Sequence, residues 1–113
     1  MRKIKTLKKN YEFKNVFSRG KFYIGKQVSL YVLKNNKKTN VIGIAVSAKQ
    51  CGAVQRNRIK RLIRENYKLL KNDLKQGYDI VFLWTKKGVA KEANYYIIKN
   101  DIEKSLKKAN LLS

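Results

Sequence analysis

Residues 53–71 carry two stripes of opposite character at helical spacing, and such a helix constrains what the whole chain can fold into. The apolar stripe recurs every three or four residues: Ile59, Leu62, Ile63, Tyr67 and Leu70. The polar and basic stripe has the same period: Asn57, Lys60, Arg61, Arg64 and Lys68. One face is therefore expected to pack into a core, while the other presents cations to a polyanion.

Arginine is concentrated in this segment. The chain has 28 Lys and Arg residues, but only six are Arg, and four of the six lie here: Arg56, Arg58, Arg61 and Arg64. A guanidinium binds phosphate in two-point geometry and stacks on bases, which an ammonium does not. Arg56 extends the basic stripe by one turn, and Arg58 projects from its flank. We interpret the segment as a nucleic-acid contact rather than a solvated charged face.

The overall charge also favours a polyanionic partner. A net charge of +21 on 113 residues repels itself in a compact chain. A membrane is the rival polyanion, but the apolar run 80–84 is far too short to span one. The basic N-terminus lacks the apolar segment and cleavage site of a signal peptide. The single cysteine, Cys51, excludes an internal disulfide, so we expect a cytoplasmic protein.

The available side chains exclude most chemistry that a protein carries out alone. The chain has no histidine, so it has no imidazole base, no Cys/His zinc site and no partner to activate Cys51. Its seven acidic residues form no close cluster of the kind that a two-metal nuclease uses. We therefore predict no catalytic residue and no metal-binding residue in this chain.

The pattern along the chain predicts one α/β domain over residues 1–113, with a basic, flexible tail at 1–8. A short helix capped by Asn10 comes first. Strand patterns cover residues 22–33 and 41–48, and the run 80–84 is typical of a central strand. The basic helix lies between the last two strands and forms a crossover unit with them. A final helix begins after Asn94, which is expected to cap it.

A second candidate site lies on one face of these strands. Alternation predicts one apolar face: Phe22, Ile24, Val28, Leu30 and Val32. The opposite face is flat and mildly polar: Gln27, Ser29, Tyr31, Gly43, Ala45 and Ser47. Phe13 and Phe17, four residues apart on the first helix, either form the other wall of a cleft or belong to the core. A cleft of this kind suits the stacking of an unpaired RNA strand.

Three segments resemble the bacterial ribonuclease P protein family. Ala53–Arg64 is similar to its arginine-asparagine-arginine signature, Leu7–Phe17 to its first helix, and Val41–Ser47 to the strand before the signature. Their order and spacing also match, so the resemblance covers essentially residues 4–108. Residues 48–52 depart from the pattern, because many members carry a second lysine and a glycine-asparagine pair there.

The resemblance implies the protein subunit of ribonuclease P, which removes the 5′ leader of precursor tRNA by Mg2+-dependent hydrolysis. The chemistry and most of the Mg2+ sites would belong to the catalytic RNA. The implied partners are that RNA and precursor tRNA, with a monomeric protein in a 1:1 complex and neither DNA nor a membrane. The implied fold is an α/β (α+β) sandwich like the second domain of ribosomal protein S5. It has about four strands and three helices, in the order α-β-β-β-α-β-α, with a left-handed crossover.

The implied RNA contacts fall into two groups. The catalytic RNA would bind the basic helix through Arg56, Asn57, Arg58, Lys60, Arg61, Arg64 and Lys68. The leader would lie in the cleft formed by Phe13, Phe17, Tyr31, Gln27, Ser29 and Ser47. Of these, Phe13, Phe17 and Tyr31 fall on positions that contact the leader in the family.

The residues alone leave other interpretations open. A noncatalytic ribosomal protein, or another protein that binds structured RNA, would use the same physics. A helix-turn-helix DNA-binding protein is disfavoured, because no short partner helix directly precedes Arg56. A surface-active basic peptide is disfavoured as well, because the apolar stripes are used by a mixed fold.

Overall fold

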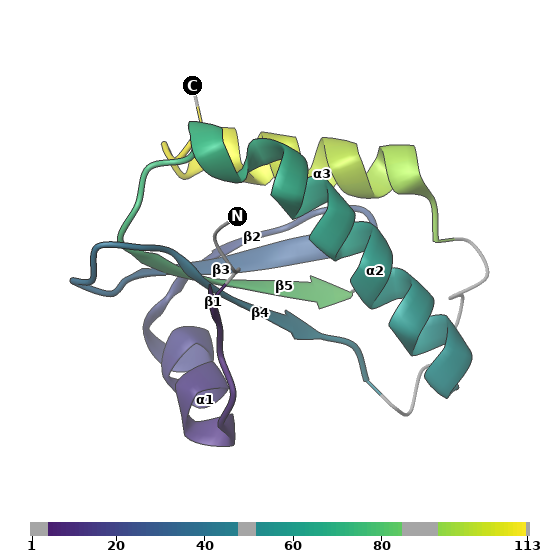
Figure 1. Ribbon diagram of the computed structural model, residues 1–113, viewed down its shortest axis with the longest axis horizontal. Coiled ribbons are helices and arrows are strands. Elements are labelled where there is room, and N and C mark those ends of the chain that lie inside the picture. The colour runs from purple at the N-terminus through teal and green to yellow at the C-terminus, as the bar shows by residue number, and fades with distance from the viewer. Residues whose placement is uncertain (1–4, 48–51, 85–92, 113) are drawn as a thin grey trace.

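The computed structural model describes residues 5–47, 52–84 and 93–112. Its helices are α1 (Asn10–Arg19), α2 (Ala53–Leu70) and α3 (Tyr95–Lys108), and the 3-10 turn η1 (Lys71–Asp73) follows α2. Its strands are β1 (Lys5–Thr6), β2 (Lys21–Tyr23), β3 (Val28–Lys34), β4 (Val41–Ala45) and β5 (Tyr78–Trp84). Figure 1 shows three layers, with α2 and α3 on one face of the sheet and α1 on the other.

The sheet is mixed, with the strand order β1-β4-β5-β3-β2. β5 lies at its centre, parallel to β4 and antiparallel to β3. The central strand and the crossover through α2 that the sequence predicted are therefore confirmed. The left-handed sense of that crossover stays a prediction.

The sheet has five strands where about four were expected. The additional strand is β1, which pairs in parallel with β4 through Lys5 and Thr6. The prediction of a flexible tail over residues 1–8 is therefore wrong from Lys5 onward. The side chain of Leu7 is buried and its N–H donates to the carbonyl of Ile42 at 2.8 Å. Residues 1–4 lie outside the described residues.

Two apolar cores occupy the two faces of the sheet. The larger one packs the inner faces of α2 and α3 on the sheet, through residues such as Ile59, Ile63, Ile98 and Phe82, all with no exposed area. The smaller core lies under α1 and contains Leu7, Val16, Val41 and Val81. The apolar stripe predicted for α2 is confirmed, since Ile59, Ile63 and Tyr67 are buried.

The helix caps differ from one helix to the next. Asn94 caps α3 as predicted, because its Oδ1 accepts the N–H groups of Tyr96 and Ile97 at 2.9 and 3.2 Å. Asn10 does not cap α1. Glu12 Oε1 instead accepts the N–H groups of Lys9 and Lys8, which lowers the pKa of the Glu12 carboxyl.

A buried carboxylate ties the β2–β3 hairpin to α3. Asp101 is 7% exposed, and its two oxygens accept the backbone N–H groups of Lys26, Gln27 and Val28 at 3.0, 2.8 and 3.0 Å. A Cβ atom at Gly25 would lie 2.9 Å from the Asp101 carboxyl carbon and even closer to the carbonyl of Val28. The hairpin therefore requires glycine at this position in order to approach Asp101.

Candidate nucleic-acid interface

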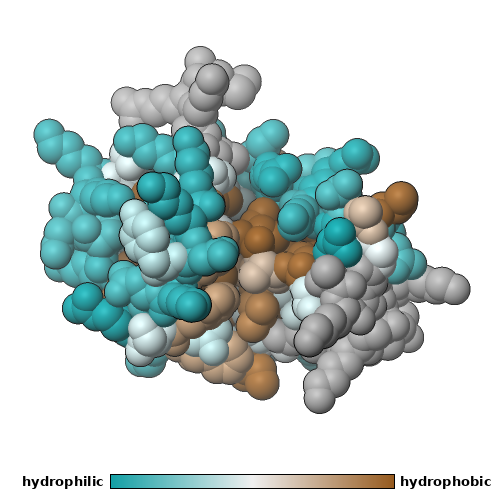
Figure 2. All heavy atoms as spheres, turned by 90° about the horizontal axis from the view of Figure 1, so that it is seen from below, coloured by the Kyte–Doolittle hydropathy of each residue, from teal (hydrophilic) through white to brown (hydrophobic). Residues whose placement is uncertain are grey.

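A groove of about 650 Å³ runs between α1, the ends of β4 and β5, and α2. Its lining combines aromatic, apolar and polar side chains: Asn10, Phe13, Phe17, Ile44, Ala45, Val46, Ser47, Lys60, Leu83 and Trp84. Figure 2 views this side of the molecule and shows an apolar strip with hydrophilic residues on either side. The predicted cleft between the first helix and the sheet is therefore present.

The groove depends on the close approach of α1 to β4. The ring of Phe13 lies directly over Gly43, where a Cβ atom would come within 2.6 and 2.8 Å of two ring carbons. Phe13 also packs on the smaller core, so it serves both as core and as groove wall. The absence of a side chain at Gly43 thus allows an aromatic ring to form this part of the wall.

A row of four aromatic rings extends from the groove across the sheet. The ring centroids of Phe13 and Phe17 are 6.5 Å apart, those of Phe17 and Tyr31 are 5.0 Å apart, and those of Tyr31 and Phe22 are 4.9 Å apart. Phe17 and Phe22 are 37% and 44% exposed. Such exposed faces can stack on unpaired bases.

The sequence pattern predicted the wrong face of the sheet for Phe22. The alternation over residues 22–33 placed it beside Leu30, but in the sheet Phe22 is the direct partner of Tyr31. The hairpin loop at residues 24–27 interrupts the alternation, so the residues before and after it follow different phases. Gly25 lies in this loop, and the alternation over residues 22–33 took no account of it.

Gln27 and Ser29 do not line the groove. Gln27 is 4% exposed and its Oε1 accepts the N–H of Asn94 at 3.0 Å. Ser29 has no exposed area, and its Oγ accepts the N–H of Gly25 at 3.0 Å. Gln27 thus binds the start of α3, and Ser29 binds the hairpin loop. Their polarity therefore satisfies backbone groups in the interior and leaves no surface for a ligand.

The basic stripe of α2 is largely presented to solvent. Asn57, Arg61, Arg64 and Lys68 are exposed as predicted. Lys60 is half-buried and lines the groove, so it brings one cation of the stripe beside Phe13 and Phe17. The basic helix and the groove therefore meet in one continuous surface. The sequence pattern alone had indicated two separate sites.

The two flanking arginines differ in their surroundings. Arg56 is half-buried near the start of α2. Arg58 is exposed, and its Nη2 donates to the carbonyl of Ala93 at 3.4 Å, close to the beginning of α3. Arg58 therefore lies on the α3 side of the helix, whereas Lys60 lies on the groove side.

Several groove residues were not predicted as site residues. Trp84, at the end of β5, is 2% exposed and yet borders the groove. Its buried Nε1 has no hydrogen-bond partner among the described residues. Leu83 and Ile44 also line the groove. The alternation within a strand could not show that these two residues lie near α1.

The described parts of the chain offer little to a metal ion. Across residues 5–47, 52–84 and 93–112, no three His, Cys, Asp or Glu side chains gather as a ligand group. Within the same ranges no helix is long and apolar enough to cross a membrane. The surface features that stand out are cationic and aromatic.

Fold and site together define a class: a small basic α/β domain whose cationic helix and aromatic groove suit a polyanion with unpaired bases. The profile of the family described as Ribonuclease P matches residues 1–110. The chain belongs to the ribonuclease P protein family, as its three sequence segments indicated.

Relatives and solved structures agree with this assignment. A Ribonuclease P protein component from Caldanaerobacter subterraneus subsp. tengcongensis is 42% identical over 109 residues, covering 96% of this chain and 92% of the relative. Another of that name from Clostridium botulinum (strain Loch Maree) is 42% identical over 106 residues, covering 93% and 94%. The solved RNase P protein of Staphylococcus aureus is 33% identical and superposes with a TM-score of 0.83, over 98% of this chain and all of the other. The expected α/β fold with three helices is thereby confirmed, with five strands in place of about four.

Proposed function

We propose that this chain is the protein subunit of ribonuclease P and that it assists the removal of the 5′ leader from precursor tRNA. The observation that carries the proposal is the junction of the basic helix and the aromatic groove at Lys60. A structured RNA on the helix and a single strand in the groove would meet at this residue. Family membership supplies the reaction in which two such RNA elements must be held together.

The exposed cations of α2 would bind the catalytic RNA. Arg61 and Arg64 offer two-point contacts to phosphate, and Lys68 extends the same face by another turn. With a net charge of +21, the protein would also screen the repulsion between two RNA molecules. Assembly with the RNA is therefore expected to weaken steeply as the salt concentration rises.

The groove would hold the leader. Phe17 and Phe13 would stack with its bases, Lys60 would contact a phosphate, and Ser47, which is exposed at the rim, would add a polar contact. Tyr31 supports the ring of Phe17 from the side. The protein would thus orient the leader relative to the bond that is cut.

The described residues do not fit a magnesium site, because Mg2+ prefers carboxylate and phosphate oxygens and no three of their acidic side chains lie together. We propose that the Mg2+ ions of the reaction are held mainly by the catalytic RNA. The protein would act on them indirectly, by reducing the repulsion among nearby phosphates.

A reconstituted cleavage assay tests the division of labour. The purified protein is expected to cut no precursor tRNA, whereas protein, cognate catalytic RNA and Mg2+ together should give one cut and a 5′-phosphate on the mature tRNA. Cleavage by RNA-free protein would overturn the assignment of chemistry to RNA. A protein that binds structured RNA but never stimulates the reaction would instead favour the noncatalytic alternative.

Phe17→Ala should weaken binding of precursor tRNA by the assembled enzyme by about 1–3 kcal/mol, which is the usual loss for one stacked base. Mature tRNA has no leader, so its affinity should stay the same, and the partly exposed ring should contribute little to folding. Affinities for both tRNAs and a thermal unfolding midpoint check this. Equal losses for the two tRNAs, with a lower midpoint, would show that Phe17 is a structural residue.

A further inference from the structure

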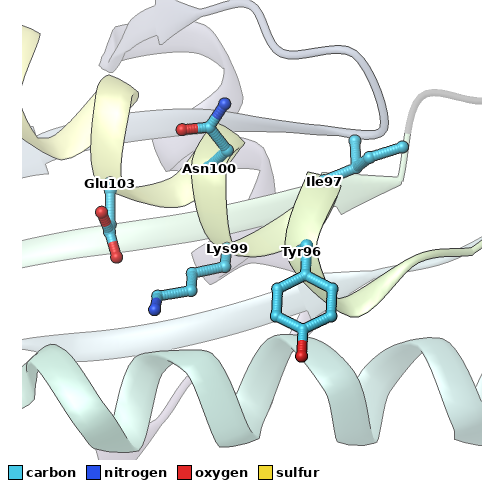
Figure 3. Close-up of a pocket in the computed structure, with 5 residues that line it drawn as sticks. All are labelled: Tyr96, Ile97, Lys99, Asn100 and Glu103. Carbon is cyan, nitrogen blue, oxygen red and sulfur yellow. The ribbon is translucent and has the colours of Figure 1, made fainter.

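The outer surface of α3 carries a second hollow, of about 500 Å³, away from the groove. It is lined by Tyr96, Ile97, Lys99, Asn100 and Glu103. Figure 3 shows Tyr96, Lys99 and Glu103 leaving α3 on one side, with Ile97 and Asn100 on the other. Tyr96 is 74% exposed, so a large aromatic face is presented to solvent at a place where folding does not use it.

Tyr96 is held by local interactions. Its N–H donates to the capping side chain of Asn94, which fixes the backbone at the first turn of α3. Its ring makes an edge contact with Tyr95, with centroids 5.2 Å apart and planes at 88°. A ring that is ordered before binding loses little conformational freedom when a flat partner stacks on it.

The helix that carries the hollow packs beside the basic helix. α2 and α3 lie side by side on the same face of the sheet (Figure 1). Arg58 of α2 donates to the carbonyl of Ala93, three positions before Tyr96. The aromatic groove lies on the α1 side of α2, where Lys60 lines it, and Arg58 lies on the α3 side of the same helix. An RNA that docks on the exposed arginines of α2 can therefore continue onto α3, whereas a strand in the groove is directed elsewhere.

We propose that this hollow binds an unpaired nucleotide of the catalytic RNA, an inference that rests on the proposed function. The base stacks on Tyr96, and the ammonium of Lys99, one turn along α3, contacts a phosphate. Glu103 lies a further turn on and repels phosphate, so it directs the backbone toward Lys99. Its carboxylate accepts a hydrogen bond from an exocyclic amino group of the base.

Tyr96→Ala tests the stacking contact, with the full-length protein and a transcript of the cognate catalytic RNA. The affinity of this variant for the catalytic RNA should fall about 5- to 150-fold, which corresponds to the loss of one stacked base. Tyr96→Phe retains the ring and should bind within about twofold of the parent. Tyr11→Ala is the matched control, since Tyr11 is 67% exposed and lies on α1. It should bind like the parent.

Two further measurements separate this site from the groove and from diffuse charge. A single-stranded leader oligonucleotide should bind Tyr96→Ala as tightly as the parent. Lys99→Ala should reduce the salt slope of catalytic-RNA binding by about one unit or slightly less, while Tyr96→Ala should leave the slope unchanged. Unchanged thermal midpoints are expected for all variants, because the substituted side chains are exposed.

Parent-like binding by Tyr96→Ala would overturn the inference and leave the proposed function intact. Loss of affinity by Tyr96→Phe equal to that of Tyr96→Ala would exclude stacking as the contact. If the parent protein itself did not bind the catalytic RNA, the proposed function would fail as well, and that result is distinct from the other two.

Discussion

Asp101→Ala is expected to lower the free energy of unfolding by about 3 kcal/mol or more, because it removes the acceptor of three backbone N–H groups. The N–H groups of Gln27 and Val28 are buried and would be left without a partner. At a few degrees per kcal/mol, the thermal midpoint should fall by roughly 10 °C or more. Asp101→Asn should lose much of the same stability, because its amide nitrogen would face a backbone donor.

Asp73→Ala is the matched control for charge. Asp73 is exposed in η1, and its loss raises the net charge of the chain by the same one unit. The thermal unfolding midpoint of Asp73→Ala should stay near that of the parent protein. Urea unfolding monitored by circular dichroism measures all three variants. If Asp101→Ala and Asp73→Ala were equally stable, the hydrogen bonds of the Asp101 carboxylate would contribute nothing to stability beyond the effect of its charge.

Ile63→Ala is expected to cost about 2–5 kcal/mol of stability, whereas Arg61→Lys, two positions earlier, should act on RNA affinity alone. Ile63 has no exposed area and packs in the larger core. Arg61 is exposed on the outer face of the same helix. Lysine keeps the charge at this position but loses the planar fork, so affinity for the catalytic RNA should fall by about 1 kcal/mol or more.

Measuring unfolding and RNA affinity on both variants separates the two faces of α2. Ile63→Ala should bind RNA nearly as well as the parent at a temperature where it is still folded. Arg61→Lys should unfold within about 0.5 kcal/mol of the parent. Parent-like affinity of Arg61→Lys would mean that its contact requires only a positive charge.

The sequence predicted the elements whose pattern is local and long. α2 follows from two stripes over 18 residues, and burial of Ile59 and Ile63 confirms the phase of its apolar face. The central strand β5 follows from an unbroken apolar run. The cleft was predicted because small residues on β4 leave room beside α1, and Phe13 and Phe17 do line it.

The errors concern short elements and long-range contacts. β1 is two residues long, so its sequence holds no periodicity, and only its pairing with β4 defines it. Gln27 and Ser29 looked like surface polar residues, but their partners are Asn94, far along the chain, and Gly25 across a tight loop. A buried polar side chain has the same local pattern as an exposed one, and only the fold decides between them.

The Phe13 ring lies so close to Gly43 that the width of the groove depends on the absence of a side chain at position 43. A methyl group at position 43 would push the ring outward, and the wall that α1 forms would move with it. By contrast, a Cβ atom at Gly52 would meet nothing within 4 Å. A substitution at position 43 would therefore change the width of the groove without altering any charged residue. An alanine there would shift the α1 wall of the groove away from β4, while the cationic helix stayed as it is.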